Sequence, residues 1–390
     1  MTAGGPVEAL AAARTLRPAL AQRAAAHDDG GAFPKADFDD IRAAGLLGLM
    51  SPTRLGGSGA GFAEYAEIAM TLAEGNGATA LLFNMHSSIT GALASMPDDA
   101  ARQLGVPDSY FAMRDRVLTQ AVSGSFYAVA MSERGSGSRL SAVTTTYEKQ
   151  GGDGYRIRGT KTFCSGAGHA DAYLVAARDG DLVSYFLVPA GEGIEVEPTW
   201  DALGMRATGS HDVHLDVVAP PDSLLGGVEG LALVLAQVMP QWLVASYAAV
   251  YVGVAQSAVD RCVEHVNERG LSHLPAVRSR LGRADAQVAA ARSVVMEAAR
   301  SIDDDPGTPR TNRSIWRAKL TAGETAMAVS ASLLEAAGTS AMRKGHPLER
   351  IFRDARCGSL QPATSDVCAD WLGMAALGMD ADAGSGVPRW

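Results

Sequence analysis

The chain has 390 residues, 47% of them hydrophobic and 20% charged, which is the balance of a soluble globular protein. Its 34 Lys and Arg against 43 Asp and Glu give a net charge of −9, and no basic cluster stands out, so nucleic acid is not an expected partner. The four cysteines form no CxxC pair, which argues against a disulfide scaffold and favours a reducing, cytoplasmic setting.

The first third of the chain shows helical spacing. In residues 1–120, apolar residues recur three or four positions apart, as in FAEYAEIAMTLAEGNG, between Gly and Pro breaks. The first 23 residues contain three arginines and lack the apolar core of a secretory signal, so they indicate an amphipathic helix. We therefore predict an N-terminal α-helical domain over residues 1–120.

The middle of the chain alternates between apolar and polar residues. The segments YEKQGGDGYRIRGTKTF and AYLVAARDGDLVSYFLV each place a Gly- and Asp-containing turn between two strand-like runs, which is typical of a hairpin. Residues 121–225 are therefore predicted to form a small antiparallel β domain.

Helical spacing returns after residue 225, so residues 226–390 are predicted to form a C-terminal four-helix bundle with a loop around Pro306 and a frayed tail over 381–390. Residues 230–259 contain no charged residue and are long enough to span a bilayer. Because Pro240 and several Gln and Ser residues interrupt this stretch, and no basic flanks accompany it, we expect a central buried helix and no membrane partner. The predicted fold class is α+β.

The short motifs that could form a phosphate-binding, metal or catalytic site are weak. The glycine-rich segments at 57–61 and 135–137 resemble phosphate-binding loops, but the first does not complete GxGxxG and neither lies in a βαβ unit. His211 and His214 lie three apart in a strand-like run and would point to opposite faces, so no metal site is expected. His86 lies in an uncharged helical segment, where a hydrogen-bonded core histidine is the favoured interpretation.

Several longer segments, in order along the chain, carry more information. They are FDDIRAAGLLGL, LGGSGAG, AMSERGSGS (130–138), KTFCSGAGHAD (161–171), LGMRATGSHDVHLDVVAPPDSLLGG (203–227) and PLERIFRDAR (347–356). Together they resemble the acyl-CoA dehydrogenase family of flavoproteins over nearly the whole chain. The resemblance implies the α, β, α fold of that family, with FAD, or FMN, between the β domain and the C-terminal bundle. It also implies a homodimer or homotetramer that shares the cofactor between subunits.

The resemblance assigns five residues to the flavin ring. Ser165 matches a family threonine whose hydroxyl hydrogen-bonds flavin N5. Met131 and Ser132 match the strand that lines the isoalloxazine, and Phe163, followed by Cys164, takes the place of the tryptophan that stacks beside it. These roles suit a flavin that accepts hydride, because hydrogen bonds around N5 stabilise the reduced ring.

Four further residues are assigned to the rest of the cofactor. Ser138 matches a serine near the thioester and pyrophosphate groups, so it counts as both a cofactor and a substrate residue. Thr364 and Asp366 resemble residues at the adenosine end, and Arg269 matches an arginine that reaches the cofactor from a neighbouring subunit.

The family base is missing from its usual position. In the family a glutamate seven residues after the alanine of RDA removes the α-proton, and the same count from Ala355 reaches Pro362, which has neither a carboxylate nor an N–H. No catalytic residue is therefore assigned, and Asp366 is the nearest carboxylate. His86 and Gln361 are assigned to the substrate side, with Gln361 standing where some monooxygenases of this fold have histidine.

Two functions follow from the resemblance. The favoured one is an FAD-dependent oxidoreductase that passes hydride from an acyl thioester, bound to CoA or a carrier protein, to flavin N5 with a non-standard or absent base, and then to an electron acceptor. The alternative is a flavin-dependent monooxygenase that uses O2 and flavin reduced by a flavin reductase, and needs no base. A scaffold without catalysis is disfavoured because Ser132, Phe163 and Ser165, the groups around N5, are kept.

Overall fold

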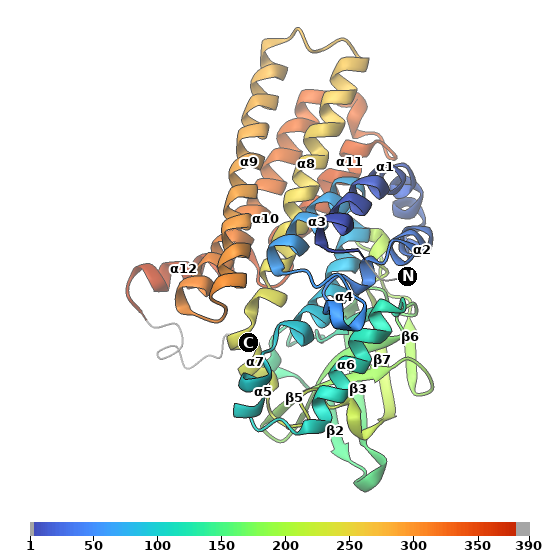
Figure 1. Cartoon of the computed structure of the whole chain (residues 1–390). Helices are drawn as coiled ribbons and strands as arrows, with labels where there is room; N and C mark the ends of the chain where they lie inside the picture. The colour runs from blue at the N-terminus through green and yellow to red at the C-terminus, as the bar shows by residue number, and fades with distance from the viewer. Residues whose placement is uncertain (1–3, 380–390) are drawn as a thin grey trace.

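The computed structural model describes residues 4–379, so the tail expected over 381–390 lies outside the described residues. Helices, strands and helices follow one another as predicted, and Figure 1 shows the β domain at one end of the molecule and the long C-terminal helices at the other. The N-terminal helices are α1 (Pro6–Gly30), α2 (Lys35–Ala43), α3 (Phe62–Gly75), α4 (Gly77–Ser95), α5 (Asp98–Gln103) and α6 (Asp108–Val122).

The middle part is one seven-stranded sheet in the order β1-β4-β2-β3-β7-β6, with β5 also paired to β4. Its strands are β1 (Tyr127–Ala130), β2 (Thr146–Lys149), β3 (Tyr155–Cys164), β4 (Ala172–Asp179), β5 (Leu182–Pro189), β6 (Ile194–Glu197) and β7 (His211–Ala219).

Both predicted hairpins are confirmed. Strands β2 and β3 pair antiparallel with Lys149 opposite Tyr155, and β4 and β5 pair antiparallel around the turn that follows Asp179. The domain is mainly antiparallel, as predicted, but two pairings are parallel: β1 with β4, with Tyr127 opposite Ala172, and a single residue pair between β2 and β4. A tight turn forces antiparallel neighbours, whereas the long connection between β1 and β4 allows them to run in the same direction.

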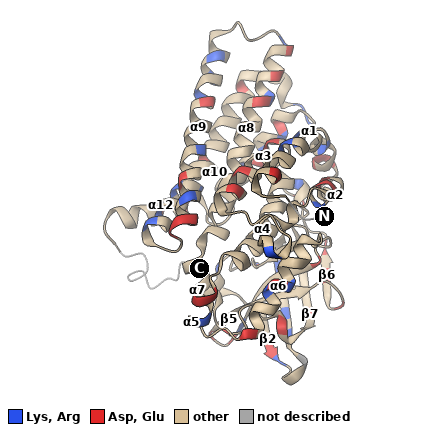
Figure 2. Ribbon diagram, in the orientation of Figure 1, with Lys and Arg blue, Asp and Glu red and all other residues tan. Residues whose placement is uncertain are grey.

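The C-terminal helices are α7 (Ala232–Val238), α8 (Ala245–Glu268), α9 (Pro275–Asp304), α10 (Pro309–Ala337), α11 (Pro347–Arg356) and α12 (Ser365–Ala376). Helix α10 begins at Pro309 after the N-cap Thr308, and it buries Ile315, Ala322 and Val329 on one stripe. Acidic and basic side chains are interspersed along α9 and α10 (Figure 2).

The uncharged stretch 230–259 was predicted to form one helix, but it forms two. Helix α7 ends at Val238, a short turn covers Pro240–Trp242, and α8 begins at Ala245. Pro240 has no N–H to donate to the preceding turn, so the helix breaks there. The segment Pro240–Glu268 is apolar and long enough to cross a membrane, but 83% of its most apolar window is buried, as in a core helix.

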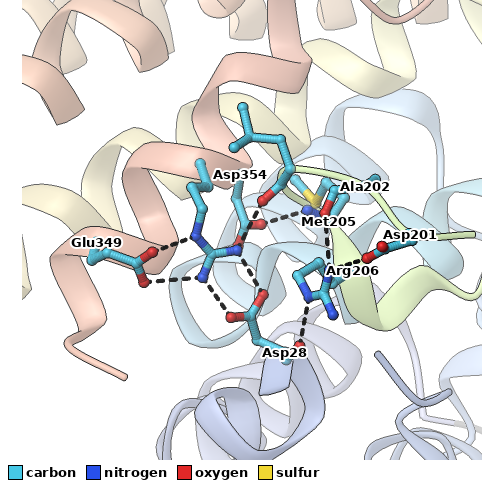
Figure 3. A network of polar contacts seen from close by, with 9 residues as sticks. Asp28, Asp201, Ala202, Met205, Arg206, Glu349 and Asp354 are labelled. Atoms are coloured by element: carbon cyan, nitrogen blue, oxygen red, sulfur yellow. Dashed lines mark hydrogen bonds and ion pairs between the residues drawn. The ribbon is translucent and has the colours of Figure 1, made fainter. Parts of the chain in front are cut away.

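A polar network ties the three parts of the chain together (Figure 3). The guanidinium of Arg353, on α11, lies between the carboxylates of Asp28 at the end of α1 and Glu349. The buried carboxylate of Asp354 accepts a hydrogen bond from the backbone N–H of Met205, in the loop between β6 and β7, at 2.6 Å. Helix α11 is thereby fixed to both the N-terminal helices and the β domain.

Candidate active site

Residues from all three parts of the chain meet around one cavity of about 540 Å³, called here the interdomain cavity. The segment after β1 contributes Met131, Ser132 and Ser138, three of the residues assigned to the cofactor, and Pro362 faces the same space from the loop before α12. The other lining residues come from α4, from β1 and the loop after it, from the turn before α8, and from the first turn of α8: Met85, Ser88, Val129, Leu140, Trp242, Leu243 and Tyr247.

A buried ion pair holds the segment that carries Ser132 and Ser138. The Glu133 carboxylate accepts hydrogen bonds from the backbone N–H and hydroxyl groups of Thr144 and Thr145, and from the Lys161 ammonium at 2.6 Å. Burial alone would raise the pKa of Glu133. The hydrogen bonds and the Lys161 charge have the larger combined effect, so the pKa is lowered to about 2. The charged carboxylate therefore anchors this loop at neutral pH.

The end of β3 presents an aromatic ring to solvent. Phe163 is 63% exposed and has a left-handed backbone, with φ of 56°, and its ring meets Trp200 edge to face at 6.0 Å. A residue other than glycine rarely adopts this conformation, and such strain is typical of functional sites. Cys164 is fully buried, and burial raises the pKa of its thiol to about 12, so its side chain belongs to the core.

Ser165 stands at the head of a chain of hydroxyl groups. Its Oγ lies 2.9 Å from Ser210 Oγ, which lies 2.7 Å from Thr208 Oγ1, and Thr208 donates to the carbonyl of Met205 at 2.8 Å. Because the last hydroxyl gives its proton to a carbonyl, each earlier hydroxyl donates inward along the chain. Ser165 Oγ then has lone pairs left to accept a hydrogen bond from a ligand.

These features fit a flavin. An exposed aromatic ring and a neighbouring hydroxyl suit the face and the polar edge of an isoalloxazine ring. In addition, Thr162 Oγ1 and Ser365 Oγ are buried and make no hydrogen bond within the described part of the chain. Buried hydroxyls are normally paired, so these two atoms indicate a polar partner outside the protein.

Lys319 is a site residue that the sequence analysis missed. It lies on α10, is fully buried, and donates to the backbone carbonyls of Gly358 at 2.8 Å, Ala363 at 3.0 Å and Gln361 at 3.1 Å. Burial lowers the pKa of Lys319 to about 8. The ammonium therefore shapes the loop that carries Pro362. Its position on the buried stripe of α10, four residues after Ile315, was the signal that could have identified it.

Phe163, Cys164 and Ser165 do not line the interdomain cavity, and neither do three further residues assigned to the cofactor. Thr364 caps α12 by accepting a hydrogen bond from Val367 N–H, and Asp366 is exposed on the first turn of that helix, so the structure does not bring the nearest carboxylate to the cavity. Arg269 is exposed at the end of α8. The side chain of Gln361 accepts a hydrogen bond from Tyr251 at 2.7 Å and so stabilises the Pro362 loop.

His86 is not a substrate residue in this geometry, and the core interpretation is the one supported. Its side chain is fully buried, Nε2 lies 2.7 Å from the carbonyl of Leu47, and Nδ1 accepts a hydrogen bond from the backbone N–H of Tyr127. Both nitrogens are therefore satisfied by the backbone. Burial lowers the pKa of His86 to about 4, so the ring is neutral at neutral pH.

A second, larger space of about 840 Å³ adjoins the first and is called here the apolar cavity. The two share Ser88, Met131, Trp242 and Leu243. Among the described residues that line either cavity there is no Asp, Glu, His, Lys, Arg or Cys. Burial raises the pKa of the lining Tyr247 to about 12, so it does not act as a base at neutral pH.

The chain matches family models for all three domains of the acyl-CoA dehydrogenases. The N-terminal domain model matches residues 9–108, the middle domain model residues 128–218, and the C-terminal domain model residues 245–364.

Individual relatives differ in their named activities. The chain is 29% identical to a putative acyl-CoA dehydrogenase of Bacillus subtilis, covering 88% of this chain and 90% of the relative. It is 30% identical to L-evernosamine nitrososynthase of a Micromonospora species, covering 94% and 89%. The FMN-bound crystal structure of TdsC, a dibenzothiophene monooxygenase of Paenibacillus, superimposes with a TM-score of 0.82 at 26% identity, covering 95% and 97%. These comparisons support a flavin cofactor, and the chain belongs to the acyl-CoA dehydrogenase family of flavin-dependent oxidoreductases.

Proposed function

We propose that this protein is a flavin-dependent monooxygenase that acts on a small apolar substrate held in the apolar cavity. The observation that carries the proposal is the absence of a base among the described residues lining the two cavities, where Pro362 faces inward. Removal of an α-proton from an acyl thioester needs a group that accepts a proton at neutral pH. Oxygen insertion does not need one at that position.

The residues suit this reaction. The flavin, once reduced by an external reductase, supplies the two electrons that activate dioxygen, so that one oxygen atom enters the substrate and the other leaves as water with two protons. The mainly apolar walls of both cavities offer few polar groups to hold water near the reacting groups. Ser165 Oγ can accept a hydrogen bond at the polar edge of the ring, while Lys319 and Tyr251 hold the Pro362 loop in place.

The lining of the apolar cavity points to the substrate class. Its lining is apolar apart from a few hydroxyl groups, and none of the described residues that line it has a cationic side chain to bind a phosphate. We therefore expect an uncharged aromatic or aliphatic substrate, and dibenzothiophene, named for the relative TdsC, is a suitable first probe.

The test supplies the purified protein with FMN or FAD, a flavin reductase with its nicotinamide donor, isotopically labelled dioxygen and dibenzothiophene. We expect a product that carries one labelled oxygen atom. Ser165→Ala should release more hydrogen peroxide per reduced flavin, and Ser165→Thr, which keeps the hydroxyl, should not. Absence of any oxygenated product from a panel of apolar aromatic compounds would contradict the proposal.

The second candidate is oxidation of an acyl thioester. It is favoured by Ser138, which resembles the family serine near the thioester and lines the interdomain cavity, and by the similarity to a putative acyl-CoA dehydrogenase. The same preparation, kept anaerobic and mixed with acyl-CoA compounds, distinguishes the two functions. Bleaching of the oxidised flavin band by a thioester would establish the dehydrogenase reaction and displace the monooxygenase.

A further inference from the structure

A third space, called here the outer groove, adjoins the apolar cavity. It has a volume of about 1600 Å³ and opens to solvent. Gly59 and Gly61, from the glycine-rich segment that the proposed function leaves without a role, line it, together with Ile302 at the end of α9. The outer groove and the apolar cavity have three lining residues in common: Met96, Met239 and Trp242.

Trp242 is the central part of this shared wall, because it also lines the interdomain cavity. Its indole is seated against Gly91 of α4, where an added Cβ would lie 2.1 Å from a ring carbon. The ring nitrogen donates to Ser95 Oγ at 3.3 Å, and the ring packs 5.0 Å from Phe62. The absence of a side chain at Gly91 therefore leaves the space that the indole of Trp242 occupies in this wall.

The wall is built on an interruption of regular structure. Trp242 lies on the short turn between α7 and α8, which Pro240 starts, and Met239 precedes that turn. On the groove side, Gln241 is 2% exposed and its Oε1 atom accepts no hydrogen bond within the described residues. A buried amide oxygen without a donor is unfavourable, so it indicates a ligand that can donate one.

We propose that Trp242, with Met96 and Met239, is the barrier that sets the maximum length of the substrate, and that the outer groove takes the far end of any ligand long enough to pass it. The ligand class is an apolar chain with a terminal hydrogen-bond donor, which Gln241 Oε1 would accept. This proposal rests on the proposed function, because it takes the apolar cavity as the substrate site.

Calorimetric binding of linear primary alcohols of increasing chain length, without reductant, tests the barrier apart from turnover. In the wild type, each methylene should raise the affinity about fourfold until the cavity is full, after which the affinity stops rising. In Trp242→Ala the rise should continue to longer chains. If Trp242→Ala does not fold, two milder variants replace it: Trp242→Phe, which keeps an aromatic ring, and Gly91→Ala, which displaces the indole. Each should shift the chain length at which the affinity stops rising.

Ile302→Ala is the matched control, because Ile302 lines the outer groove but not the apolar cavity. It should leave alcohol binding unchanged in the wild type and weaken binding of the longest alcohols in the Trp242→Ala background. The same length limit in wild type and all the wall variants, or no alcohol binding at all, would overturn the proposal. Product formation from dibenzothiophene is measured separately, so failure here is distinguishable from failure of the monooxygenase function.

Discussion

Burial decides what His86 can do. The imidazole is fully enclosed by α4 and its neighbours, and both ring nitrogens are hydrogen-bonded to backbone groups around Leu47 and Tyr127. Burial lowers the pKa of His86 to about 4 against the opposing effect of the hydrogen bond to Leu47. Protonation would remove the lone pair that accepts the Tyr127 N–H, so the charged form is incompatible with the observed pairing.

This arrangement predicts acid sensitivity. The pKa of His86 is about 4 in the folded state and 6.5 in the reference state, so the unfolded chain binds more protons between these values and stability falls as pH drops from about 6.5 to 4. The loss attributable to this residue should approach about 3 kcal/mol. Chemical denaturation at several pH values should show this loss in the wild type, and a smaller one in His86→Gln.

His273→Gln is the control, because His273 is exposed in the loop between α8 and α9. Its pH profile should match that of the wild type. Profiles of His86→Gln and wild type that run parallel from pH 6.5 to 4 would show that another group causes the acid loss.

At the scale of elements, Arg353 joins parts of the fold that are distant in sequence. Its guanidinium donates to Asp28 at 3.0 Å and to Glu349 at 2.6 Å, and its side chain is only 15% exposed. The first carboxylate belongs to α1 and the second to α11 itself. Removal of the cation would leave two nearby carboxylates in a place with little water to solvate them.

Arg353→Met should therefore lower the free energy of unfolding by about 3 kcal/mol, measured by urea denaturation at neutral pH. Arg156→Met is the matched control, because Arg156 pairs with the exposed Asp216 on the sheet surface and should lose less than about 1 kcal/mol. Equal losses in the two variants would mean that the α1–α11 pairing stabilises the fold no more than a surface ion pair.

The elements also show what could be predicted from sequence. Local signals were sufficient for the two hairpins and for the helices of the C-terminal part such as α10, because both depend on residues a few positions apart. The parallel pairing of β1 with β4 was missed, because it joins segments separated by a long connection. Pro240 was noted as an interruption of the apolar stretch, yet the break into α7 and α8 was not predicted.

The same limit applies to the site. Met131, Ser132 and Ser138 were assigned by resemblance to family motifs, and the structure places all three on one cavity. Lys319 and Trp242 belong to none of the motifs that carry the family resemblance. Their roles depend on which loops and helices pack against them, and that information is in the tertiary structure rather than in the neighbouring sequence.

At the scale of the whole molecule, α4 contributes lining residues to the interdomain cavity, the apolar cavity and the outer groove. It lies between the C-terminal bundle and the sheet (Figure 1), has no charged residue, and contributes Met85 and Ser88 to the interdomain cavity. Gly91 of the same helix seats Trp242. A helix without a charged side chain on any face is stable only when it is enclosed, and α4 is enclosed where the three parts of the chain meet.

Arg269, which the resemblance assigns to the cofactor, lies away from the cavities. It caps the end of α8, where α8 and α9 meet far from the β domain (Figure 1), and its side chain is exposed. Ser165 follows β3 in the β domain, so the two residues belong to opposite ends of the molecule. Because the resemblance assigns Arg269 to the cofactor, we propose that it contacts the flavin of a second copy of the chain, so that flavin affinity depends on association of the chains.

We therefore predict that wild-type protein loses flavin on dilution below the concentration at which it dissociates, measured by ultracentrifugation and flavin fluorescence. Arg269→Ala should weaken flavin binding about tenfold even in the associated form, because a charge-assisted hydrogen bond is lost. Arg278→Ala removes another exposed arginine near the start of α9 and should leave the affinity unchanged. A flavin affinity that is independent of both protein concentration and Arg269 would place the whole cofactor within one chain.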